Sequence, residues 1–120
     1  MKKLLVTTAV STTLLSAPVA FADTLKIGVM ATLEGTYTVL GEDGVRGIKT
    51  ALAAFGGKAG GKDIELVIQS TDASPDSAVR AARKLVEQDG LDVIVGPLSG
   101  SEGIAIRDYS KTQPGTTFIN

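Results

Sequence analysis

The residues of this sequence best suited to chemistry lie in the segment Ser99-Gly100-Ser101-Glu102, which leads into a predicted helix. Two hydroxyls, a glycine that admits close approach and the free N–H groups of a helix start favour a bound anion such as a carboxylate. The alternative roles are structural, because a serine can cap the helix and Glu102 can offset its dipole. We expect a non-covalent anion site here, and capping is compatible with it.

A second candidate segment is the Gly- and Thr-rich stretch 32–41. Tyr37 and Leu40 could supply apolar contact to a ligand, and Glu34 could accept hydrogen bonds from an ammonium group. Tyr37 could equally pack on the surface, and Glu34 could be a solvated loop acid.

Covalent catalysis finds no support in the residue types. The chain has no His and no Cys, which removes Ser-His-Asp and Cys-His arrangements and the commonest transition-metal ligands. We therefore expect no enzyme activity, no metal and no cofactor. The 12 basic and 13 acidic residues give a net charge of −1, so nucleic acid is not an expected partner.

The elements that must position these residues follow from periodicity. Short apolar stretches predict four strands, at 25–31, 64–70, 92–96 and 116–120. Helices are predicted between them, at 42–55, from Ser74 (N-cap) and Pro75 to Gly90, and at 102–111. Strands that alternate with helices of this length indicate a parallel sheet with right-handed crossovers.

The predicted fold class is therefore α/β, a doubly wound parallel sheet whose strands, numbered along the chain, lie in the order 2-1-3-4. Ligands of such sheets bind beyond the carboxyl ends of the strands, where the strand order reverses. That point lies between the first and third strands, so the loops 32–41 and 97–102 should meet there.

The first 22 residues have the order of a cleavable export signal. Lys2 and Lys3 precede an uncharged run, and Ala20-Phe21-Ala22 places small residues before Asp23. We predict a signal peptide over 1–22, cleaved between Ala22 and Asp23. A retained anchor or a buried helix are the alternatives, but hydroxyl residues dilute the run. No Cys follows the signal, so no lipid anchor is expected.

The order of the motifs resembles that of the type I periplasmic binding proteins, and among them the leucine/isoleucine/valine-binding components of ABC importers. The resemblance covers 23–120 and rests on segments 25–29, 35–41, 56–57, 72–75 and 93–103. It implies that 23–120 is a partial N-terminal lobe, the front part of the first of two lobes that close on a small ligand.

The resemblance also implies site residues. In the family, the loop matching Ser99, Gly100 and Ser101 helps to hold the ligand, and some members place an aromatic residue at the position of Leu40. Several members join the second and third βα loops by a disulfide, whose positions match Ser74 and Ser99 here. Gly100 stands where amino-acid binders often have Ser, which leaves room for aromatic acids or amides.

The expected function is that of a periplasmic solute-binding component of an ABC importer. Its partners would be a small amino-acid-like or other carboxylate- or amide-bearing solute and a permease in the inner membrane. A ligand-sensing receptor ectodomain of the same fold and an exported α/β enzyme are the alternatives. The residues that follow Asn120 would distinguish them.

Overall fold

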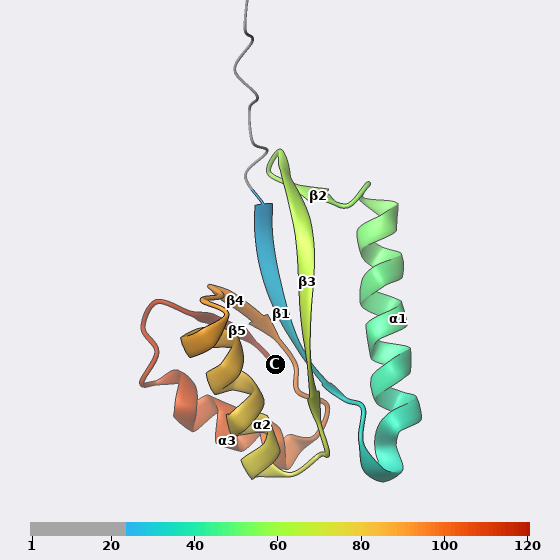
Figure 1. Ribbon diagram of the computed structural model, residues 1–120. Helices are drawn as coiled ribbons and strands as arrows, with labels where there is room; N and C mark the ends of the chain where they lie inside the picture. Colours follow the sequence, from blue (N-terminus) through green and yellow to red (C-terminus); the bar gives the residue numbers. More distant parts are fainter. Residues whose placement is uncertain (1–23) are drawn as a thin grey trace, which may run out of the picture.

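A five-stranded sheet organises residues 24–120, the part of the chain that the computed structural model describes (Figure 1). Its order is β2-β3-β1-β4-β5. The strands are β1 (Thr24–Thr32), β2 (Lys58–Ala59), β3 (Lys62–Thr71), β4 (Val93–Val95) and β5 (Thr117–Ile119). The pairs β1–β3, β1–β4 and β4–β5 are parallel, and β2 runs antiparallel to β3. The predicted signal peptide and its cleavage site lie outside the described residues.

The predicted fold class and strand order are confirmed, because β3, β1, β4 and β5 are the four predicted strands in the order 2-1-3-4. The short β2 is absent from the predicted elements, since two residues are too few to show a period. It forms a hairpin with β3 through Gly60 and Gly61, both with positive φ, a conformation that glycine adopts without steric cost.

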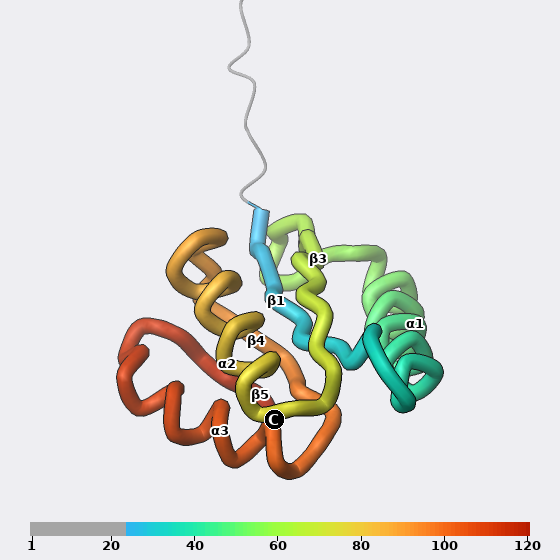
Figure 2. Tube along the Cα trace, turned by 60° about the horizontal axis from the view of Figure 1, so that its bottom comes forward, coloured from blue at the N-terminus to red at the C-terminus, as the bar shows by residue number. Residues whose placement is uncertain are grey.

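Helices cover both faces of the sheet (Figures 1 and 2). The 3₁₀ turn η1 (Gly35–Tyr37) continues into α1 (Thr38–Ala54), which lies on one face. On the other face, α2 (Pro75–Arg83) continues as the π-helical turn η2 (Lys84–Gln88) and packs beside α3 (Gly100–Ser110). No helix within 24–120 has the length and apolar character needed to cross a bilayer.

The start of α1 differs from the prediction. The helix begins at Thr38 instead of Glu42, so Leu40 lies in its first turn and not in a loop. The apolar stripe begins only at Val45, which is why periodicity misses the first turns. Those turns are fixed by Gly41 instead: a Cβ at this position would overlap the carbonyl oxygen of Thr32 in β1.

The core lies between the sheet and the α2–α3 layer. Leu85, Ile94 and Ile106 are completely or almost completely buried in it. Full burial of each such side chain stabilises the fold by about 1.5–3 kcal/mol. In β1, Gly28 leaves the space that Leu85 fills, since a Cβ at position 28 would lie 3.1 Å from a methyl carbon of Leu85. This layer anchors α3 and therefore the position of its first turn.

Candidate ligand-binding site

The strand order reverses at β1, which pairs with β3 on one side and β4 on the other. A crevice of about 160 Å³ opens there, between the carboxyl ends of β1 and β4 and the first half of α1. Its lining is mostly apolar and includes Leu40 of α1 and Leu98 of the loop after β4, which are 53% and 47% exposed. Tyr37 is 53% exposed one turn before Leu40, and it is not among the residues that line the crevice.

Gly96 shapes the loop between β4 and α3. Its φ of 101° lies in the region that favours glycine, and a Cβ would collide with the carbonyl oxygen of Met30 in β1. The loop therefore runs close to the end of β1 and brings Leu98 into the lining of the crevice, whereas Gly100, in the first turn of α3, lines a separate hollow with Ile104 and Asn120.

The first turn of α3 is held by a capping box. The Ser99 hydroxyl oxygen accepts from the Glu102 N–H at 3.3 Å, and Glu102 Oε2 accepts from the Ser99 N–H at 3.1 Å. The Ser99 hydroxyl and Glu102 Oε2 are also 2.9 Å apart. Glu102 is completely buried, and its Oε1 has no hydrogen-bond partner among residues 24–120. The structure thus gives both side chains the capping role that the sequence left open.

Gly100 and Ser101 differ from these two residues in being exposed. Their N–H groups are the first two of α3, which an α-helix leaves without intrahelical partners. A Cβ at Gly100 would meet no atom within 4 Å, so a small molecule can reach the backbone. Of the predicted segment, Gly100 and Ser101 therefore present donors to solvent, with the positive end of the helix dipole behind them.

A hydrogen bond joins the loops that precede α2 and α3. The Ser99 hydroxyl lies 3.3 Å from the carbonyl oxygen of Ala73, whose φ of 69° turns that loop toward α3. Ser74, the other position that the family resemblance matched to a disulfide, caps α2 by accepting from the Ser77 N–H at 3.3 Å. A polar contact therefore stands where several family members have a covalent one.

Glu34 lies away from the crevice. Its Oε1 accepts a hydrogen bond of 2.7 Å from the Ser70 hydroxyl, and it lines a separate polar hollow beside β3 and α2. The structure does not bring Glu34 together with Leu40 and Leu98. After β1, the N–H of Glu34 donates to the carbonyl of Thr71 at the end of β3, and the 3₁₀ turn η1 then carries the chain to α1.

Two features of the site region are missing from the prediction. The Thr32 and Thr71 hydroxyls, both buried, lie 3.2 Å apart and join the ends of β1 and β3. The side chain of Asn120 lies against Gly103 of α3, where a Cβ would collide with it. Thr32 and Thr71 end their strands and Asn120 follows β5, and these positions were a usable signal, because ligand loops of parallel sheets follow the carboxyl ends of strands.

A doubly wound sheet with a crevice and a free helix N-terminus at its reversal point defines an α/β ligand-binding lobe. The sequence profile of the periplasmic binding protein family matches residues 24–118, and the chain belongs to this family. Its fold is that of the type I periplasmic binding proteins, as the solved structures below show.

Three similar proteins place the chain more closely. It is 31% identical over 112 residues to "Leu/Ile/Val-binding protein homolog 6" of Brucella abortus (strain 2308), covering 92% of this chain and 28% of that one. An ABC transporter substrate-binding protein from Sphaerobacter thermophilus superposes with a TM-score of 0.73 at 33% identity, over 80% of this chain and 26% of that one. The ABC transporter solute-binding protein of Rhodopseudomonas palustris BisB5, in complex with 3,4-dihydroxybenzoic acid, superposes with a TM-score of 0.73 at 27% identity, over 80% of this chain and 26% of that one. The chain thus spans about a quarter of the length of these relatives.

Proposed function

We propose that the complete protein is the periplasmic solute-binding component of an ABC importer, which captures a small carboxylate-bearing solute and delivers it to a membrane permease. The observation that carries the proposal is the apolar crevice at the reversal of strand order, with the N-terminus of α3 following β4 at the same end of the sheet. In this arrangement the N–H groups of Gly100 and Ser101 and the Ser101 hydroxyl hold the carboxylate. The apolar part of the solute extends toward Leu40 and Leu98.

The relatives support this division of the ligand into an acid and an apolar part. One is named for leucine, isoleucine and valine, and another was solved with 3,4-dihydroxybenzoic acid. Both kinds of molecule join a carboxylate to an apolar or aromatic body. Solute-binding proteins perform no covalent chemistry, and we assign none to this chain.

A thermal-shift panel of branched-chain amino acids and aromatic acids on the complete mature protein tests the proposal. A ligand at 100 times its Kd adds about 2.7 kcal/mol to the free energy of unfolding, which is a measurable rise in Tm. If no carboxylate raises Tm, the proposed function fails.

Variants then locate the site. Ser101→Ala and Gly100→Val are expected to weaken binding of the best ligand, because the first removes a donor and the second blocks access to the backbone. Glu34→Ala serves as the matched control, since Glu34 faces the separate polar hollow. Equal losses in all three variants would remove the α3 N-terminus from the site.

A further inference from the structure

Gly44 lies in the interior of α1, where a glycine weakens the helix relative to alanine. Packing does not explain its presence, because a Cβ at position 44 would meet no atom within 4 Å. In this it differs from Gly41, whose Cβ would overlap the carbonyl oxygen of Thr32. The free space at Gly44 therefore has another explanation, and its place beside the ligand crevice supplies one.

Gly44 is part of the wall that α1 contributes to the crevice. Leu40, Gly44 and Ile48 lie at i, i+4 and i+8, which is one row along the face of the helix, and all three line the crevice. A side chain at position 44 would project from this row, between Leu40 and Ile48, into the crevice. The missing side chain of Gly44 therefore adds directly to the space that a ligand can use.

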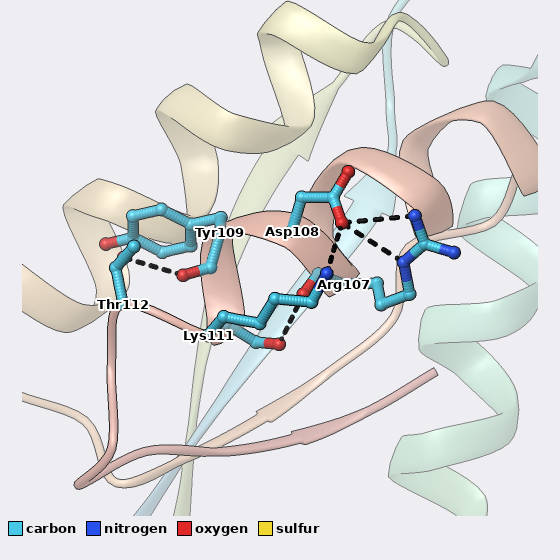
Figure 3. Close-up of polar contacts among 6 residues, drawn as sticks. Arg107, Asp108, Tyr109, Lys111 and Thr112 are labelled. Carbon is cyan, nitrogen blue, oxygen red and sulfur yellow. Dashed lines mark hydrogen bonds and ion pairs between the residues drawn. The ribbon is translucent and has the colours of Figure 1, made fainter.

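The lining of the crevice is suited to an apolar group. Of the residues 24–120, none with a charged side chain lines it, and its only polar side chain is that of Thr32, which is completely buried with its hydroxyl 3.2 Å from that of Thr71. Charged groups of the lobe pair on its surface instead. Figure 3 shows one such group at the end of α3, where Arg107 and Lys111 both contact Asp108, at 3.1 and 2.9 Å.

The volume of the crevice indicates the size of that apolar group. The crevice measures about 160 Å³ with no side chain at position 44. An apolar cavity of about 150 Å³ is enough to hold a benzene molecule. A methyl or isobutyl group at position 44 would occupy part of this space, and a ring would no longer fit.

We propose that Gly44 is a specificity-determining residue, whose missing side chain leaves room for an apolar body about the size of a benzene ring on a carboxylate-bearing solute. The inference rests on the proposed function and names the size class of its ligand. The same glycine that weakens α1 then widens the crevice, so helix stability and ligand size are set against each other at this one position.

The test measures ligand affinity by calorimetric titration of the complete mature protein. Two pairs of probes share an acid group and differ in the apolar body: benzoate with propionate, and leucine with alanine. The readout is the preference for the larger member of the pair that binds, given as the ratio of the two Kd values. Gly44→Ala should lower this preference roughly tenfold, because one added methyl group in an apolar pocket has an effect of this size. Gly44→Leu should abolish it, with little change in affinity for the smaller member.

Gly47→Ala and Gly47→Leu are the matched controls. Gly47 lies in the same helix, and a Cβ there also meets no atom within 4 Å, but Gly47 does not line the crevice. Both control variants should keep the wild-type preference. Because alanine strengthens the helix at either position, a general effect on folding cannot produce a difference between the two sites.

Four outcomes overturn the inference: a wild type without preference for the larger probes, a wild type that binds other carboxylates but none of the four probes, a Gly44→Leu variant with the wild-type preference, or an equal loss in Gly47→Leu. A wild-type protein that binds no carboxylate at all would instead refute the proposed function, so the two failures are distinguishable.

Discussion

Replacing Ser99 by alanine should separate the structural from the ligand-binding role of the α3 N-terminus. The substitution removes the N-cap of α3, which typically contributes about 1 kcal/mol. It also removes the hydroxyl that lies 2.9 Å from the buried Glu102 carboxylate, and a hydrogen bond to a charged group contributes about 1.5–3 kcal/mol. The contact with the Ala73 carbonyl, at 3.3 Å, disappears as well.

These contributions share one hydroxyl and are not fully additive, so we expect Ser99→Ala to lower the free energy of unfolding by about 2–4 kcal/mol. Urea unfolding of the complete mature protein, followed by circular dichroism, should show a lower midpoint at unchanged slope. Amide hydrogen exchange should accelerate in the first turn of α3.

Ser101→Ala is the matched control for this prediction. Ser101 is exposed, and among residues 24–120 its hydroxyl contacts only that of Ser99, at 3.3 Å. It should change the free energy of unfolding by less than about 0.5 kcal/mol, as surface substitutions usually do. A Ser99→Ala protein as stable as the wild type, or a Ser101→Ala protein equally destabilised, would refute the capping-box account.

Three further predictions concern packing and pH. Gly41→Ala should destabilise the protein by more than about 2 kcal/mol, because the new Cβ clashes with Thr32. Gly44→Ala, in the same helix, places its Cβ in open space and should stabilise the protein by about 0.5–1 kcal/mol. Thermal unfolding of both variants checks these opposite signs. Ile94→Ala in the core should cost about 2–5 kcal/mol in urea unfolding, and a loss below 1 kcal/mol would contradict the packing described. The pKa of Asp72 is lower in the folded protein than its ordinary 3.8, so its contribution is present above that pH and is lost as pH falls through the folded pKa. Asp72→Asn should therefore reduce the dependence of the free energy of unfolding on pH below about pH 4. An unchanged pH dependence in this range would argue against this role of Asp72.

The sheet was predictable because its signals are local and strong. Apolar runs of strand length, separated by amphipathic helices, fix an alternating pattern, and the handedness of crossovers then leaves few topologies. Ser74 and Pro75 likewise predict the start of α2, where the structure places the N-cap and the first helical residue. These features depend on short stretches of sequence.

The details of the candidate site depend on contacts between distant residues. The early start of α1 follows from Gly41 packing on Thr32. This close approach leaves no periodic pattern of apolar residues in the sequence. The burial of Glu102 depends on how α3 packs beside α2, and first-turn acids are usually solvated.

The central place of β1 in the sheet has a consequence for biosynthesis. A polypeptide leaves the ribosome N-terminus first, so β1 emerges before either of the strands that flank it. β3 begins at Lys62 and β4 only at Val93, and until both are available the apolar residues of β1 have no neighbours to cover them. The nascent chain therefore carries an unpaired, aggregation-prone segment until β4 has been synthesised. A chaperone that recognises extended apolar segments should bind this stretch first and release it once β4 can pair.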